Sequence, residues 1–173
     1  ILYGNMSVSV IRDMPKGRLP IKTAVVKPKS RPTSYKFIHD EIEKGHKAYI
    51  ICPLVEASES TEAENVQDYA IKLREIFKDR AKIEFLHGKM KNQEKNEIMD
   101  SFAHGDTDIL ISTTVVEVGV NVPSATVIMI ENANRFGLAA LHQLRGRVGR
   151  SNRTAYAFLM YKRDKMLKEV AEK

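Results

Sequence analysis

The residues of this chain with the clearest chemical potential form an arginine-rich segment. Residues 141–150 (LHQLRGRVGR) place three arginines and two glycines within six positions, directly after an apolar stretch. Arginine keeps its charge at physiological pH, and its planar guanidinium can donate to two phosphate oxygens at once. The glycines remove side-chain bulk, which would let the arginines approach a ligand closely. The segment is therefore a candidate phosphate site, the alternative being a solvated basic turn.

Two further segments have the character of phosphate contacts. Residues 112–121 (STTVVEVGVN) follow an apolar run, and hydroxyls and backbone N–H groups at a strand-to-loop transition suit a phosphate. The alternative for them is a Ser/Thr turn that caps a short helix. Residues 87–91 (HGKMK) combine a glycine and two lysines with the start of a predicted helix, whose N-terminus favours anions. The alternative here is a pair of solvated lysines beside a turn.

The chain lacks the residues that bind and hydrolyse a nucleotide unaided. No Gly-x-x-x-x-Gly-Lys-Ser/Thr phosphate loop occurs, and no Asp-Glu pair closes a predicted strand to hold Mg²⁺. The five histidines have no metal-ligand spacing, and the single cysteine, Cys52, excludes an internal disulfide. The arginines could thus stabilise a phosphate transition state, but only around a nucleotide held by something else.

The composition is that of one folded domain with a core of its own. The chain has 173 residues, of which 43% are hydrophobic and 29% charged. Its net charge of +6 makes a polyanionic partner plausible. No apolar stretch of about 18 residues could span a membrane and no signal peptide is visible, so we expect a cytoplasmic protein. The chain does not begin with methionine, which indicates a piece of a longer protein.

Apolar runs of strand length alternate with helix-like segments from residue 21 onward. The predicted strands cover residues 21–27, 47–54, 82–86, 108–112, 125–130 and 155–161. The predicted helices cover residues 32–44, 66–77, 92–104, 138–144 and 162–173. Such alternation is typical of an α/β fold in which helices cover both faces of a mostly parallel sheet.

The domain boundaries follow from the breaks in this pattern. Residues 1–20 include a short alternating run at 7–11 and then a Pro- and Gly-containing break at 14–20, so we assign them to an approach segment. Residues 21–161 form the predicted domain, and residues 162–173 begin a helical extension. Because ligands of such sheets bind outside the carboxyl ends of the strands, we expect the candidate segments at 53 onward, 87–89, 112–121 and 145–150 to gather there.

Five blocks of sequence carry a resemblance to a known family. They are LYGN (2–5) with VSVIRDMPKGR (8–18), CPLVE (52–56), LHGKM (86–90), ISTTVVEVGVNVP (111–123), and IENANRFGL (130–138) leading into residues 141–150. In this order they resemble the second RecA-like domain of superfamily 2 helicases, and within it the RecG family of ATP-dependent branch-migration helicases. The transcription-repair coupling factor is a close relative that residues 151–153 and 155–157 would suit, whereas residues 14–18 favour RecG.

The resemblance implies a three-layer α-β-α RecA-like domain, with the fold of P-loop NTPases but without its own phosphate loop. Residues 1–20 would then be the linker from, or the end of, a preceding motor lobe that binds most of ATP and Mg²⁺. The chain would be the C-terminal motor lobe of a DNA helicase or translocase that acts in recombination and repair by branch migration and fork reversal. It would contact branched or double-stranded DNA through the phosphate backbone and would be inactive alone.

The same resemblance assigns roles to residues around the nucleotide. Arg147 and Arg150 are the candidate arginine fingers on the γ-phosphate of ATP, and Gln143 helps to organise their motif across the cleft. Gly119 and Glu117 belong to the motif that couples the nucleotide to DNA. A correctly placed finger supplies about 10³ to 10⁵ in rate for phosphoryl transfer.

Other residues match the nucleic-acid contacts of that family. Thr113 and Thr114 resemble its phosphate-contacting hydroxyls. Asn121 belongs instead with the candidate ATP contacts. It stands where many relatives carry Asp, so a contact to the ribose of ATP there would keep a hydrogen bond without the charge. A further backbone-contacting motif is matched by His87, Gly88 and Lys89.

A second class of function stays open from the residues alone. The chain could be a stand-alone nucleic-acid-binding or interaction module with a helicase-like fold and no ATPase role, which the missing phosphate loop would favour. An upstream reading frame that contains a Gly-Lys-Thr phosphate loop would decide for the helicase.

Overall fold

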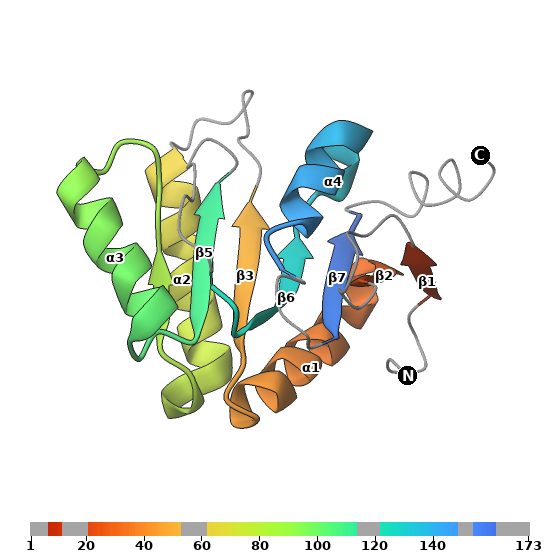
Figure 1. Ribbon diagram of the computed structural model, residues 1–173, viewed down its shortest axis with the longest axis horizontal. Helices are drawn as coiled ribbons and strands as arrows, with labels where there is room; N and C mark the ends of the chain where they lie inside the picture. The colour runs from red at the N-terminus through yellow and green to blue at the C-terminus, as the bar shows by residue number, and fades with distance from the viewer. Residues whose placement is uncertain (1–6, 12–20, 53–61, 114–121, 149–153, 162–173) are drawn as a thin grey trace.

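A mostly parallel sheet forms the middle layer of the domain (Figure 1). The computed structural model describes residues 7–11, 21–52, 62–113, 122–148 and 154–161. Within them, the sheet has seven strands in the order β1-β2-β7-β6-β3-β5-β4. The strands are β1 (Ser7–Ile11), β2 (Ile21–Val26), β3 (Lys47–Cys52), β4 (Ile83–Phe85), β5 (Ile109–Thr113), β6 (Ala125–Ile130) and β7 (Ala155–Met160). All neighbouring strands from β2 to β4 in this order are parallel.

Two layers of helices enclose the sheet. They are α1 (Arg31–Glu43), α2 (Glu62–Phe77), α3 (Asn92–His104) and α4 (Leu138–Arg145), with short 3₁₀ turns η1 (Pro28–Ser30), η2 (Lys78–Arg80) and η3 (Ala133–Arg135). Helices α1 and α2 pack on one face of the sheet, and α3 and α4 pack on the other (Figure 1). No helix in the described part of the chain has the length and apolarity to cross a membrane.

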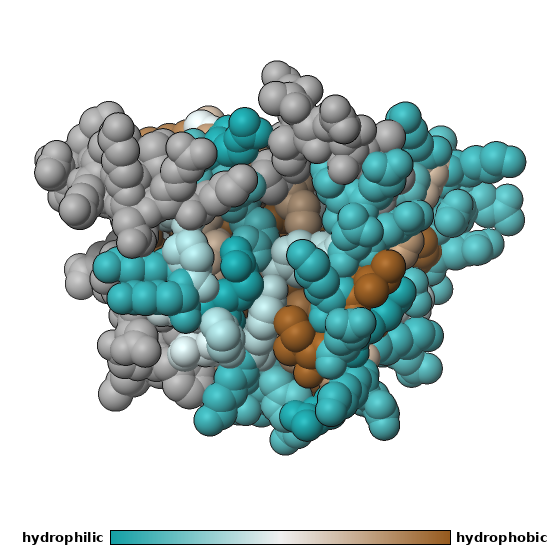
Figure 2. All heavy atoms as spheres, turned by 180° about the vertical axis from the view of Figure 1, so that it is seen from behind, coloured by the Kyte–Doolittle hydropathy of each residue, from teal (hydrophilic) through white to brown (hydrophobic). Residues whose placement is uncertain are grey.

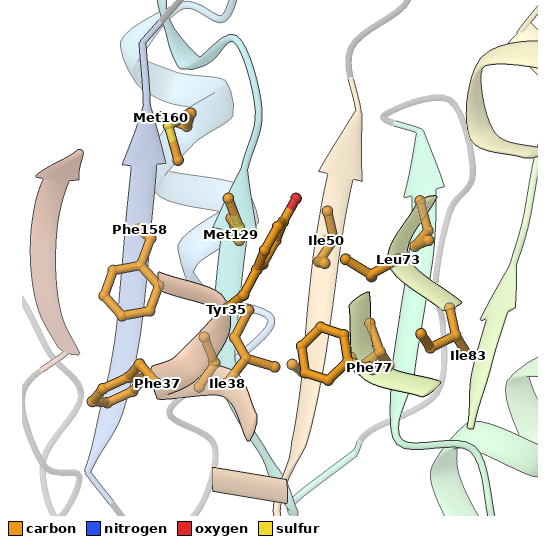
Figure 3. Packing of buried hydrophobic residues seen from close by; sticks show 14 of the residues in the cluster. Tyr35, Phe37, Ile38, Ile50, Leu73, Phe77, Ile83, Met129, Phe158 and Met160 are labelled. Atoms are coloured by element: carbon orange, nitrogen blue, oxygen red, sulfur yellow. The ribbon is translucent and has the colours of Figure 1, made fainter. Parts of the chain in front are cut away.

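The strands are apolar because both of their faces are covered. Along β3, Ala48 and Ile50 pack under α1 and α2, whereas Tyr49 and Ile51 pack under α3 and α4. Period-two alternation of side chains therefore divides the interior into two cores. Figure 3 shows the first core, in which the labelled side chains come from α1, α2 and the sheet. Each side chain that is fully buried in this way contributes about 1.5 to 3 kcal/mol of apolar transfer energy.

The three-layer fold with a mostly parallel sheet is confirmed. Six predicted strands occur within one or two residues of their expected limits, as when 108–112 becomes Ile109–Thr113. Segment 7–11 is also a strand, and β1 extends the sheet by pairing antiparallel with β2, with Ser7 opposite Val25. The boundary at residue 20 stays a prediction. The predicted helix at 162–173 lies outside the described residues.

The end of α1 shows how sequence sets local structure. Gly45 has φ of 87°, a left-handed conformation that glycine adopts without strain. Its N–H donates to the carbonyl of Ile42 at 2.9 Å, and the N–H of His46 donates to that of Glu41 at 3.0 Å. The last carbonyls of the helix are thereby satisfied, and the chain turns directly into β3.

Candidate nucleotide and nucleic-acid site

Several predicted site residues lie at the carboxyl edge of the parallel strands. Residues 87–89 follow β4 closely, and Thr113 is the last residue of β5. Strand β4 pairs with β5, with Phe85 opposite Ile111, so these two segments are neighbours on one edge of the sheet (Figure 1). This is the edge at which ligands of parallel sheets bind.

The arginine motif follows a helix, as the helix predicted at residues 138–144 implied. It follows α4 rather than a strand, and Val148 packs into the core that α3 and α4 cover. The motif is therefore presented from a helical layer and not from a strand end.

The turn after α4 is tightly hydrogen-bonded. The N–H of Gly146 donates to the carbonyl of His142 at 3.1 Å, that of Arg147 to Leu144 at 3.1 Å, and that of Val148 to Arg145 at 3.2 Å. A Cβ atom at Gly146 would lie 3.3 Å from the carbonyl oxygen of Gln143. The glycine thus permits a close approach of backbone to backbone at this turn.

Burial separates the side chains of the motif. Leu141, Leu144 and Val148 pack inward and are 9%, 4% and 1% exposed. Gln143 lies on the opposite side of α4 and is exposed, and Arg147 is half-buried. The apolar residues thus anchor the turn, while Gln143 and Arg147 keep access to solvent.

Arg145 differs from the half-buried Arg147 because it is only 5% exposed. Its Nη1 donates to Nδ1 of His142 at 3.1 Å. A guanidinium so deeply buried belongs to the internal frame of the turn and is not free to meet a ligand.

The segment after β4 forms a turn that leads into α3. The N–H of Met90 donates to the carbonyl of His87 at 3.3 Å, and Nζ of Lys95 donates to the carbonyl of Gly88 at 3.2 Å. The ring of His87 is half-buried and stacks on Phe85 at 6.3 Å between centroids. Gly88 and Lys89 are exposed. Lys89 therefore has the access that a phosphate contact needs, and the assignment of residues 87–89 to nucleic acid stays a prediction.

Thr113 is placed differently, since only 3% of it is exposed. It is the partner of Cys52 in the parallel ladder between β3 and β5. Its assignment as a phosphate contact stays a prediction. The remaining predicted site residues lie outside the described residues, so their roles also stay predictions: Thr114, Glu117, Gly119, Asn121 and Arg150. In the described residues, no three His, Cys, Asp or Glu side chains gather to hold a metal ion.

A buried polar cluster at the same edge was not anticipated from the sequence. Glu131 directly follows β6 and is 7% exposed. Arg31 donates to both of its carboxylate oxygens, from Nη2 to Oε1 at 2.8 Å and from Nε to Oε2 at 3.3 Å. The hydroxyl of Tyr69 donates to Oε2 at 2.5 Å and is itself 2.7 Å from the hydroxyl of Tyr35. A glutamate placed directly after a six-residue apolar strand is the feature that could have revealed it.

The surroundings within this cluster raise the pKa of Arg31 and of both tyrosines. Burial acts to lower the pKa of the Arg31 guanidinium, but the hydrogen bond and charge of Glu131 outweigh it, so that this pKa is raised. Burial, partly offset by the bond to Tyr69, raises the pKa of Tyr35 to about 12. Burial and the nearby Glu131 carboxylate raise the pKa of Tyr69 well above its usual value. Arg31 therefore stays charged and both phenols stay protonated at neutral pH.

A groove of about 820 Å³ lies between α1 and α2, away from the arginine motif. Its lining residues are Pro28, Arg31, Pro32, Tyr35, Lys36, His39, Asp40, Ile76, Phe77 and Arg80. The view from behind shows a mostly hydrophilic surface with small hydrophobic spots (Figure 2). Ile76 of α2 is 51% exposed. It lies about 60° around the helix from Leu73, at the margin of the stripe that faces the sheet.

The fold and the arginine motif together define a helicase C-terminal domain. The chain belongs to the family of the helicase conserved C-terminal domain, whose sequence model matches residues 33–152. It is similar to the ATP-dependent DNA helicase RecG of Streptococcus pneumoniae, with 48% identity over 158 residues that cover 91% of this chain and 24% of that protein. RecG of Borreliella burgdorferi is 44% identical over 161 residues, which cover 93% of this chain and 23% of that protein.

The solved structures agree with the sequence relatives. A structure of RecG bound to a three-way DNA junction matches with a TM-score of 0.72 and 37% identity, over 92% of this chain and 21% of that one. Domain 2 of the DEAD-box helicase Mss116p, bound to an RNA duplex, matches with a TM-score of 0.64 at 20% identity, over 86% and 57% of the two chains. The second likeness concerns the fold alone. The chain spans about a quarter of the length of the curated relatives it matches.

Proposed function

We propose that this chain is the second motor lobe of an ATP-dependent DNA helicase or translocase that acts on branched DNA in recombination and repair. ATP and Mg²⁺ would be bound mainly by a preceding lobe in cis, with Arg147 and Arg150 reaching the γ-phosphate across the cleft. The main observation in support of this proposal is how the arginine motif is held. The buried side chains of Leu144 and Val148 fix the turn, while Arg147 keeps access to solvent. The similarity to RecG supports the same function.

The chemistry assigned to this lobe is electrostatic. Charge that develops on the phosphoryl oxygens is stabilised best by donors that are already in place, because no reorganisation is then needed. The anchored turn supplies such preorganisation. DNA contacts through backbone phosphates would make binding independent of sequence and steeply dependent on salt. Closure of the two lobes around ATP would couple hydrolysis to movement along DNA.

Replacing Arg150 by alanine in the intact protein tests the proposal. Arg150→Ala should abolish DNA-stimulated ATP hydrolysis, a fall of about 10³-fold or more in kcat, while ATP binding is largely spared. Steady-state hydrolysis and binding of a labelled nucleotide would be measured on the same preparation. Normal hydrolysis by this variant would exclude the finger role of Arg150. Absence of DNA-stimulated hydrolysis in the unaltered intact protein would favour a nucleic-acid-binding module without ATPase function.

A further inference from the structure

We propose that Glu131 is a positioning residue for the arginine motif. Its carboxylate, held by Arg31 and Tyr69, fixes the start of the segment that leads from β6 through α4 to Arg147. The inference rests on the proposed function, because the motif matters only if it meets ATP. It concerns a residue that touches no substrate and acts through the segment that follows it.

The position of Glu131 follows from strand geometry. Val127 and Met129 of β6 pack in the core under α1 and α2, whereas Ile128 and Ile130 pack under α3 and α4. Glu131 continues this alternation, so its side chain points to the α1 side of the sheet, where Arg31 donates to its carboxylate. Its N–H also donates to the carbonyl of Ile51 at 2.9 Å, so that backbone and side chain are fixed at once.

The carboxylate is held from two separate helices. Arg31 lies in the first turn of α1 and Tyr69 lies in the middle of α2. Tyr35 extends the network, and Figure 3 shows its ring rising from α1 toward the carboxyl edge of the sheet. The Glu131 side chain is 10% exposed and that of Arg31 is 37% exposed, so the pair is only partly screened by solvent. The position of the Glu131 carboxylate is thus set by both α1 and α2.

The chain then crosses from one helical layer to the other. Asn132 has φ of 49°, a left-handed conformation typical of turns, and the fully buried Ala133 belongs to the core under α3 and α4. The N–H of Arg135 donates to the carbonyl of Asn132 at 2.9 Å, and η3 ends at the residue before Phe136. Helix α4 begins at Leu138 and has only 8 residues. A shift at Glu131 is therefore passed along a short, hydrogen-bonded path to the turn that carries Arg147.

Stability alone does not account for a charged pair at this place. Removing a carboxylate and part of a guanidinium from water is costly, and apolar residues of similar volume often serve stability as well or better. The bidentate pair fixes the orientation of Glu131, because a planar guanidinium sets the plane of the carboxylate that it binds. A displacement of about 1 Å in a catalytic group can cost about 10²-fold in rate. The network is suited to prevent such a displacement.

The test compares two buried carboxylates in the intact protein. Glu131→Gln removes the charge and keeps the shape. Glu41→Gln is the matched control, since Glu41 is 4% exposed, bonded to Thr126, His46 and Lys44, and lies at the opposite edge of the sheet. We expect Glu131→Gln to lower the kcat of DNA-stimulated ATP hydrolysis between about 10- and 100-fold, with KM for ATP within about twofold. Glu41→Gln should keep the kcat of the folded protein.

A less disruptive variant keeps the test decisive if Glu131→Gln fails to fold. Tyr69→Phe removes only the hydroxyl that donates to Glu131, so we expect a folded protein with kcat lowered severalfold and KM unchanged. Equal kcat values for Glu131→Gln, Tyr69→Phe and Glu41→Gln would overturn the inference. Failure of the proposed function would look different, since Arg150→Ala would then hydrolyse ATP normally. Loss of activity in Arg150→Ala beside full activity in Glu131→Gln would refute the positioning role alone.

Discussion

Glu41 of α1 and Thr126 of β6, 85 positions apart in the sequence, meet at the amino edge of the sheet. The Thr126 hydroxyl donates to Oε1 of Glu41 at 2.8 Å, and the same oxygen lies 3.1 Å from Nδ1 of His46. Nζ of Lys44 donates to the other oxygen at 3.1 Å. Both oxygens of a carboxylate that is 4% exposed are thereby satisfied.

This contact predicts how stability depends on pH. Burial acts to raise the pKa of Glu41, but the hydrogen bonds from Thr126, His46 and Lys44 outweigh it, so that the pKa is lowered from its usual 4.5. A depressed folded-state pKa stabilises the fold above pH 4.5 and loses that contribution as the pH falls below it. Urea unfolding of the chain should therefore show stability that declines below about pH 4.5. Glu41→Gln should be less stable at pH 7 and flatter in this range; an unchanged slope would contradict the assignment.

The isolated chain should not hydrolyse ATP. Its arginines have no phosphate loop in the sequence to work with, so the phosphoryl group would not be held in place. The measurement is phosphate release by the purified 173-residue chain with and without duplex DNA. Turnover that persists through purification and disappears in Arg147→Ala would show that the site is not divided between two lobes.

Lys89 should contribute to DNA binding without affecting sequence preference. It is exposed in the turn before α3, at the edge where the strands end. Lys89→Ala should weaken binding of the intact protein to all duplexes alike and lower the slope of log K against log salt by about 1. Lys72→Ala is the control, because Lys72 is also exposed but lies on α2. Equal effects of the two variants would mean that residues 87–89 are not a specific contact.

Phe158 should contribute strongly to the free energy of unfolding. It is fully buried on β7 and meets Phe37 edge-to-face, with 5.2 Å between ring centroids. Phe158→Ala should lower the free energy of unfolding by about 3 to 5 kcal/mol, since it leaves a cavity between α1 and the sheet. Ile71→Ala, at a site 55% exposed on α2, should stay within about 0.5 kcal/mol. Chemical denaturation of both variants measures the contrast.

The sequence by itself determined the layered α/β fold and the place of the arginine motif in the chain. Continuous apolar runs such as 125–130 predict strands buried on both faces, and β6 occupies those residues. The spacing of Gln143, Arg147 and Arg150 is a local property of the chain, so the resemblance to helicases could be drawn before any coordinates. The end of α1 at Gly45 is likewise a local effect, because glycine adopts a φ of 87° without strain.

Only the tertiary structure decided which distant residues meet. Nothing in the spacing of Arg31, Tyr69 and Glu131 predicts that they converge, because their contact depends on the order of strands in the sheet and on which face each helix covers. The same holds for Glu41 and Thr126. Burial also separated Arg145, enclosed within the domain, from the half-buried Arg147, two arginines that the sequence places in one motif. The hydrophobic periodicity of the sequence predicts which face of a helix or strand is buried. The tertiary packing determines which distant residues that face contacts.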